Sequence, residues 1–213
     1  MIRVRCRYCR ESFEAQRQSA KYCCLAHRVS AHWYRHHKPN AMTNARNGHN
    51  GDDEWITPTP VLDLARRVLG SIDLDPATNL PAQERVCATV FYTIEDDGLS
   101  RPWRGRVWIN PPYSRALIPL FVTKLIAEYE AGRVSAAVLM TPLATDTAWF
   151  RAAERACTAV CFTHQRIHCD KSDGGKPHRA RVPSAFFFFG NRVAAFQRHF
   201  GTLGRVYLSE QGG

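Results

Sequence analysis

The sequence of 213 residues has no long hydrophobic run, either at its start or further along. Its longest apolar stretches, AAVLM at 136–140 and AFFFFG at 185–190, are far shorter than the roughly 18 residues that suggest a membrane span. The first ten residues, MIRVRCRYCR, are basic and lack the apolar centre of a secretory signal. We therefore expect a cytoplasmic protein whose eight cysteines are reduced thiols or metal ligands, not disulfides.

Acidic residues are scarce at the start of the chain. Residues 1–50 contain ten lysines and arginines but only Glu11 and Glu14 as acids, so they carry +8 of the net charge of +10. The rest of the chain is nearly balanced, at +2. A concentrated basic segment beside a nearly neutral one is typical of a protein that binds a polyanion such as nucleic acid. A solvated basic tail is the alternative explanation.

A glycine-rich nucleotide-binding loop is also absent, because DPATNLPAQ stands where a G-x-G loop would follow the first strand of the main domain. Apolar periodicity nevertheless alternates between helix and strand along the chain. The expected helices cover 59–70, 116–132, 145–156 and 192–200, and the expected strands cover 71–77, 104–110, 134–141, 158–163, 183–190 and 205–208. This alternation predicts an α/β fold with a mostly parallel sheet and helices on both faces.

Composition divides the chain into three parts. Residues 1–38 form the basic segment with four of the cysteines, and residues 39–53 are rich in Asn and Gly with almost no large apolar side chain. The second part is therefore expected to be a linker, and residues 54–213 the α/β domain.

The first part contains four potential zinc ligands. They are the C-x-x-C pair Cys6 and Cys9, followed after thirteen residues by Cys23 and His27 at i, i+4 spacing. This pattern suits a structural zinc ion in a tetrahedral site. Cys24 is an alternative third ligand, His32 or His36 an alternative fourth, and unrelated reduced thiols are the other explanation.

Two basic segments are candidates for nucleic-acid contacts. The stretch RVSAHWYRHHK at 28–38 interleaves positive charge with aromatic rings, which suits phosphate contacts and base stacking. The polar segment 164–184, between two expected strands, is either a loop that reads DNA or a solvated loop. The candidate contacts in the two segments are Arg28, Trp33, Arg35, Arg166, Lys176 and Arg179.

The stretch RVWINPPYSR at 106–115 contains the most specific chemical signal in the chain. Pro111 and Pro112 fix the backbone φ angle near about −65° and remove two N–H donors, so the corner presents acceptors. The Asn110 side-chain oxygen and the Pro111 carbonyl together suit the two hydrogens of one aromatic amine. Tyr113 offers a ring face for stacking on a base. The sequence therefore predicts a catalytic corner at Asn110, Pro111, Pro112 and Tyr113, with a stiff turn as the alternative.

Asn-Pro-Pro-Tyr after a strand resembles the catalytic motif of amino-group methyltransferases that use S-adenosylmethionine. Together with DEWITP (53–58), SIDLDPA (71–77), EDDGLSRPWRGRVWINPPYS (95–114) and AFFFFG (185–190), it resembles the phage-type DNA N6-adenine methyltransferases, the Dam family of phages and prophages. The resemblance covers roughly residues 53–208. It implies a Rossmann-like methyltransferase sheet, double-stranded DNA as the partner, and action in a bacterial cell or a phage-infected host.

The resemblance also implies nine cofactor contacts in three segments. They are Trp55, Thr57 and Pro58 beside the methionine end of S-adenosylmethionine, Asp73, Asp75 and Pro76 at the end of the first strand, and Asp97, Gly98 and Leu99 around its adenine ring. A carboxylate at the end of the first strand would suit the ammonium or ribose hydroxyls of the cofactor. Because the glycine-rich loop is absent, these contacts rest on the resemblance alone.

Other functions fit the same motifs. Asn-Pro-Pro-Tyr also occurs in methyltransferases that act on RNA adenine or on protein glutamine, and the basic segment favours nucleic acid without separating RNA from DNA. A catalytically inactive zinc-finger DNA-binding protein is the alternative from a different class. No obligate protein partner is visible in the sequence.

Two smaller predictions concern the middle of the α/β domain. Cys157 and Cys161 are expected to be core thiols instead of members of a second metal site. Asp146 is expected to cap the helix at 145–156.

Overall fold

The computed structural model describes residues 2–5, 12–21, 55–171 and 182–209, and the chain divides into two compact units. In the first unit, strand β1 (Ile2–Arg5) pairs antiparallel with β2 (Ser12–Ala15). The predicted zinc ligands Cys6, Cys9, Cys23 and His27 and the linker at 39–53 lie outside the described residues. The zinc module and the division at residues 38 and 53 therefore stay predictions.

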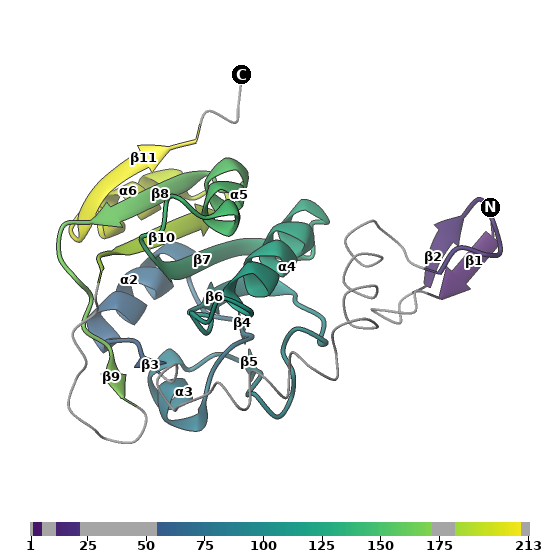
Figure 1. Cartoon of the computed structure of the whole chain (residues 1–213), viewed down its shortest axis with the longest axis horizontal. Coiled ribbons are helices and arrows are strands. Elements are labelled where there is room, and N and C mark those ends of the chain that lie inside the picture. The colour runs from purple at the N-terminus through teal and green to yellow at the C-terminus, as the bar shows by residue number, and fades with distance from the viewer. Residues whose placement is uncertain (1, 6–11, 22–54, 172–181, 210–213) are drawn as a thin grey trace. The chain divides into compact units, whose positions relative to one another are not determined.

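The second unit contains a mixed sheet of seven strands in the order β11-β8-β10-β7-β6-β4-β5 (Figure 1). The strands are β4 (Leu74–Asp75), β5 (Val90–Phe91), β6 (Gly105–Ile109), β7 (Val134–Pro142), β8 (Ala159–Thr163), β10 (Ser184–Phe189) and β11 (Gly204–Leu208). Neighbours from β5 to β7 are parallel, whereas β10 is antiparallel to β7 and β8, and β11 is antiparallel to β8. Strands β4 to β8 therefore all have their carboxyl ends at one edge of the sheet.

The α/β fold predicted from the sequence is confirmed, but the expectation of a mostly parallel sheet was wrong. Three of the six neighbouring strand pairs are antiparallel, because β10 inserts between β7 and β8 and β11 adds at the edge. Apolar runs alone do not reveal this direction, since strands buried on both faces have the same composition in either orientation.

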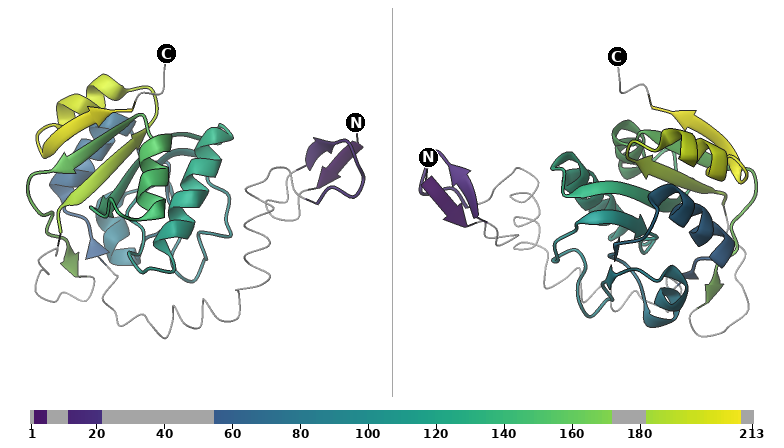
Figure 2. Two further views of the ribbon diagram at one scale, coloured as in Figure 1. Left: turned by 45° about the horizontal axis from the view of Figure 1, so that its top comes forward. Right: turned by 180° about the vertical axis from the view of Figure 1, so that it is seen from behind.

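Helices cover both faces of the sheet (Figures 1 and 2). α2 (Thr59–Leu69) and α6 (Val193–Phe200) lie together on one face, and α4 (Ile118–Glu130) and α5 (Ala148–Ala156) lie together on the other. The short helix α3 (Leu80–Val86) packs beside α2 and near β3 (Trp55–Ile56), which pairs antiparallel with β9 (Asp170–Lys171). Among the described residues, no helix has the length and apolar character needed to cross a membrane.

The four phenylalanines of β10 lie at the centre of the core. All of Phe186–Phe189 are buried, and alternate rings point to opposite faces of the sheet. Phe188 stacks with one ring of α6 at a centroid distance of 5.1 Å, and Phe186 packs at a tilt against another at 5.0 Å. Phe187 packs edge-on against Phe150 of α5 at 4.9 Å. Burying each such ring contributes about 1.5–3 kcal/mol, so this strand anchors both helical layers.

The helix ends follow local capping rules, with one correction. Gly70, with φ of +87°, closes α2 and donates its N–H to the Arg66 carbonyl at 2.6 Å. Thr147 caps α5 by accepting the Phe150 N–H at 3.4 Å, so the prediction that Asp146 is the cap was wrong by one residue. Cys157 and Cys161 are buried, which confirms them as core thiols.

Candidate active site

The Asn110–Tyr113 corner begins directly after Ile109, the last residue of β6. β6 is an inner strand held between β4 and β7, and Ile109 is fully buried opposite Leu139. Pro111 is buried, while Asn110, Pro112 and Tyr113 are half-buried. The structure therefore places the predicted catalytic corner at the carboxyl edge of the sheet, where α/β proteins bind ligands.

The side-chain amide of Asn110 has a hydrogen-bond partner at each end. Tyr113 donates its hydroxyl to Asn110 Oδ1 at 2.6 Å, and Asn110 Nδ2 donates to Thr57 Oγ1 at 3.3 Å. The amide oxygen is thus turned toward Tyr113, and the amide nitrogen toward the segment before α2. Sequence analysis assigned separate roles to the Asn110 amide and the Tyr113 ring, whereas in the structure the two side chains are hydrogen-bonded to each other.

Thr57 lies between strand β3 and helix α2, and the residue is only 3% exposed. Before it, β3 is held by β9 through the pairs Trp55–Lys171 and Ile56–Asp170. After it, Pro58 precedes α2, and its carbonyl accepts the first two hydrogen bonds of that helix. Trp55 and Pro58 are half-buried. The segment that the family resemblance assigns to the cofactor therefore also contacts the predicted catalytic corner, through the hydrogen bond between Thr57 and Asn110.

Asp75, the last residue of β4, is a buried carboxylate. It accepts the Ala77 N–H at 3.2 Å, and burial raises its pKa to about 7 against the opposing effects of Ala77 and Thr78. No cationic side chain of the described residues contributes to this pKa. A carboxylate in such a place is costly to ionise unless a cation joins it, so Asp75 is suited to bind a positively charged group.

The loops that follow β4 and β5 are packed against each other. A Cβ on Gly98 would lie 2.0 Å from the Pro76 carbonyl oxygen, so only glycine fits there without a backbone shift. Asp97, with φ of +54°, adopts the left-handed conformation, and Leu99 is buried. Trp103 holds the turn by donating its Nε1–H to the Gly98 carbonyl at 2.8 Å. The structure therefore brings two of the three predicted cofactor segments together.

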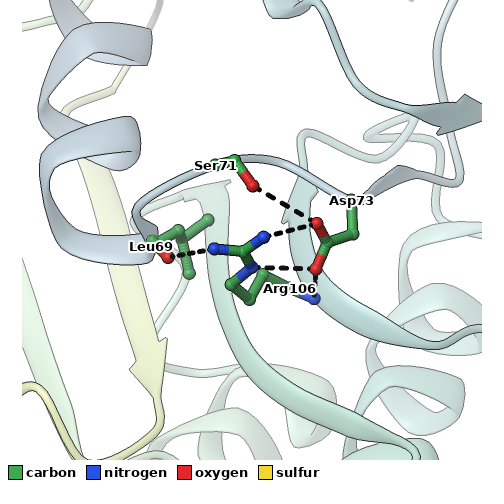
Figure 3. A network of polar contacts seen from close by, with 4 residues as sticks. All are labelled: Leu69, Ser71, Asp73 and Arg106. Atoms are coloured by element: carbon green, nitrogen blue, oxygen red, sulfur yellow. Dashed lines mark hydrogen bonds and ion pairs between the residues drawn. The ribbon is translucent and has the colours of Figure 1, made fainter.

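Asp73 has a structural partner (Figure 3). The guanidinium of Arg106 donates to both of its carboxylate oxygens, at 2.7 and 2.8 Å, and also to the Leu69 carbonyl at 3.4 Å. The hydrogen bond from Arg106 is the main reason that the pKa of Asp73 is lowered. Gly105 leaves room for this pair, because a Cβ there would lie 2.6 Å from Asp73 Oδ2. The bridge joins the chain after α2 to the start of β6, and sequence analysis did not anticipate it.

A charge cluster formed by two residues of α4 and by Arg133, which follows that helix, packs against Trp103 and through it against the Asp97–Leu99 turn. Lys124 Nζ lies 3.3 Å from Glu128 Oε1 and 5.4 Å from the Trp103 ring centroid, and Arg133 also binds Glu128. Burial lowers the pKa of Lys124, while Glu128 and, more weakly, Asp97 oppose this effect. Buried ion pairs add little net stability but hold a fixed geometry. Two opposite charges four residues apart, among the apolar residues of the helix, were the sequence signal for this cluster.

Two exposed arginines lie at the same edge of the sheet as the predicted catalytic corner. Arg166, a predicted DNA contact, follows the carboxyl end of β8, and Arg115, which sequence analysis did not single out, lies two residues beyond Tyr113. The other predicted DNA contacts, Arg28, Trp33, Arg35, Lys176 and Arg179, lie outside the described residues. In the ranges that the structure describes, no group of three or more His, Cys, Asp or Glu side chains is arranged to hold a metal ion.

The sheet and the corner together define an α/β fold of the methyltransferase type, with Asn-Pro-Pro-Tyr at the end of an inner strand. The family model described as DNA N-6-adenine-methyltransferase (Dam) matches residues 44–212, and the chain belongs to this family. A curated relative, the DNA N-6-adenine-methyltransferase of Escherichia phage T1, is 35% identical over 112 residues, 52% of this chain and 44% of the relative. The chain thus matches less than half the length of that relative, while the family resemblance predicted from the sequence is confirmed.

Proposed function

We propose that this chain transfers the methyl group of S-adenosylmethionine to the N6 amine of adenine in double-stranded DNA. The observation that carries the proposal is the Asn110 amide, whose oxygen is held by hydrogen bonding at the carboxyl end of β6 beside an aromatic ring. Family membership supports the same substrate and position.

An aromatic amine is a weak nucleophile, because its lone pair is delocalised into the ring. The residues of the corner suit this chemistry. In our proposal, Asn110 Oδ1 and the Pro111 carbonyl accept the two amine hydrogens and so direct the lone pair away from the ring plane. Tyr113 gives up its bond to Asn110 and stacks on the extruded base, a contact worth about 1–3 kcal/mol. The methylated nitrogen is cationic and then loses a proton to solvent.

The cofactor supplies a methyl group bonded to a cationic sulfur. The residues present fit such a group, because Asp75 is a buried carboxylate that lacks a cation among the described residues. We propose that Asp75 holds the ammonium or ribose end, and that the Asp97–Leu99 turn, fixed by Trp103 and the Lys124 cluster, holds the adenine ring. We propose that Asp73 stabilises the structure around this site and does not contact the cofactor, since its carboxylate is already paired with Arg106.

We further propose that residues 1–38 fold around a structural zinc ion and tether the enzyme to DNA. The spacing of Cys6, Cys9, Cys23 and His27 and the charge of +8 on residues 1–50 support this role. Zinc has no task in methyl transfer to nitrogen, so it would act only on folding and binding. DNA in the cytoplasm of a bacterial cell or a phage-infected host is the substrate that we propose.

The test is methyl transfer by the full chain from labelled S-adenosylmethionine to three substrates: unmethylated duplex DNA of mixed sequence, RNA of the same sequence, and glutamine-containing peptides. We expect label in DNA, recovered after hydrolysis as N6-methyldeoxyadenosine. Label in RNA or peptide with none in DNA would overturn the proposed substrate, and label in none of them would overturn the activity.

Two asparagine variants make this test specific to the corner. Asn110→Ala is expected to abolish the labelling, because the amide oxygen is lost. Asn191→Ala is the matched control and should retain it, since Asn191 is exposed and follows the carboxyl end of β10, which lies at the opposite edge of the sheet.

A further inference from the structure

Thr57 is buried against the catalytic asparagine, 53 positions away in the sequence. Its hydroxyl oxygen lies 3.3 Å from Asn110 Nδ2, and only 3% of the residue is exposed. We propose that Thr57 is a positioning residue that holds the Asn110 amide with its oxygen toward the target amine. This inference rests on the proposed function and assigns Thr57 a different task from the cofactor contact that the resemblance implies.

The argument begins with the shape of an amide, whose oxygen and nitrogen ends are nearly equal in size but opposite in hydrogen bonding. Only one orientation of Asn110 presents an acceptor to an amine. The flipped amide would set its own N–H groups against the N–H groups of the base. An interaction that distinguishes the two ends of Asn110 is therefore needed before the corner can act.

In the base-free structure, both ends of the amide are satisfied. Tyr113 donates to Oδ1 at 2.6 Å, and Thr57 accepts from Nδ2. When the target amine takes the place of the Tyr113 hydroxyl, Oδ1 accepts from the amine and Nδ2 still requires an acceptor. Thr57 Oγ1 supplies it, so this contact alone persists from the free enzyme to the reacting complex.

The position of Thr57 is set by backbone structure on both sides. The β3–β9 pairing fixes Trp55 and Ile56 immediately before it, and an ion pair of 2.6 Å between Arg85 and Asp170 ties β9 to α3. Pro58, the N-cap residue of α2, follows directly after it. The backbone on both sides therefore fixes where the Thr57 hydroxyl oxygen lies, and a fixed oxygen is what a positioning group requires.

A positioning role of Thr57 would affect kcat, whereas a cofactor contact would affect the Kd for S-adenosylmethionine, so measuring both constants separates the two roles. Thr57→Val keeps the shape and removes the acceptor, which leaves the amide nitrogen unpaired. We expect kcat to fall about tenfold while the Kd values for S-adenosylmethionine and DNA change less than about threefold. Thr57→Ser, which restores the hydroxyl, should recover kcat to within about threefold of the original enzyme.

Thr89→Val is the matched control, because Thr89 is exposed before the amino end of β5, at the opposite edge. Thermal melting establishes that each variant is folded, and Thr57→Ala provides a second variant without the acceptor. An active enzyme in which Thr57→Val and Thr57→Ala keep full kcat would overturn the positioning role. Weaker cofactor binding at unchanged kcat would also overturn it, in favour of the cofactor contact. Absence of methyl transfer by the unaltered chain would instead contradict the proposed function.

Discussion

Replacing Asp75 by asparagine is expected to stabilise the ligand-free protein at alkaline pH and to weaken cofactor binding at the same time. Asp75 is buried, and its pKa is raised to about 7 by that burial. Asparagine keeps an oxygen for the Ala77 N–H but cannot ionise. The variant therefore removes the unfavourable buried charge together with the proposed partner of the cofactor's ammonium group.

The magnitude follows from the two pKa values of this carboxyl. Between its ordinary value of 3.8 and about 7, the folded protein keeps a proton that the unfolded chain has lost, so the free energy of unfolding falls as pH rises through this window and is level above it. A shift of about three pKa units corresponds to about 4 kcal/mol. We expect Asp75→Asn to exceed the original protein in stability by up to about 4 kcal/mol at pH 8, and to match it near pH 4.

Urea unfolding of the ligand-free full chain at several pH values, followed by the fluorescence of buried Trp103 and Trp108, measures this difference. Asp73→Asn is the matched control with the opposite sign. Its pKa is lowered by Arg106, so its stabilising effect is present above its ordinary pKa and is lost as pH falls. If Asp75→Asn were less stable than the original protein at pH 8, the reasoning about its buried charge would be refuted.

The same carboxyl predicts the pH dependence of cofactor binding. A bound ammonium group favours the ionised form of Asp75, so the Kd for S-adenosylmethionine should fall as pH rises from about 6 to 8. Asp75→Asn should bind the cofactor weakly at every pH, without this trend. Parallel pH profiles in the two proteins would show that another group receives the ammonium.

Three further predictions concern the corner, the DNA surface and the metal. Tyr113→Phe should keep kcat/KM within about tenfold of the original enzyme, because the ring remains. Tyr113→Ala should lose the base stacking, worth about 1–3 kcal/mol. Equal losses of kcat/KM in the two variants would mean that the hydroxyl carries the effect. Arg115→Ala should weaken binding to all DNA sequences alike and reduce the slope of log K against log salt by about one, which titration at several salt concentrations measures. The 213-residue chain purified without chelator should contain about one equivalent of zinc, and Cys9→Ser clearly less. Zinc well below one equivalent in the original protein would remove the metal hypothesis.

Long elements of the fold could be predicted from the sequence because each contains many apolar residues in a recognisable arrangement. The helix at α4 and the strands β7 and β10 each carry enough consecutive apolar positions to identify their type. By contrast, β3, β5 and β9 have two residues each, which is too short for any alternation to show. The helix α3 carried a usable signal that sequence analysis passed over, since Asn79 caps it by accepting the Ala82 N–H at 2.8 Å.

The corner itself was predictable because its chemistry lies in four consecutive residues. Its supporting contacts were not, since they join residues that are distant in sequence. Thr57 reaches Asn110 across 53 positions and Arg106 reaches Asp73 across 33, so both contacts depend on how the whole domain folds. Two aspartates separated by one residue, Asp73 and Asp75, look alike in the sequence, yet an arginine partner and full burial give their pKa values opposite shifts.

The central claim is that the Asn110 amide oxygen receives the target amine. Single-turnover methyl transfer, with enzyme in excess over duplex DNA and saturating S-adenosylmethionine, tests it most directly. Asn110→Ala should slow this step by at least about 10²-fold, as expected for loss of a pre-organised polar group, with DNA and cofactor binding unchanged and Asn191→Ala unaffected. A rate for Asn110→Ala equal to that of the original enzyme would contradict the account.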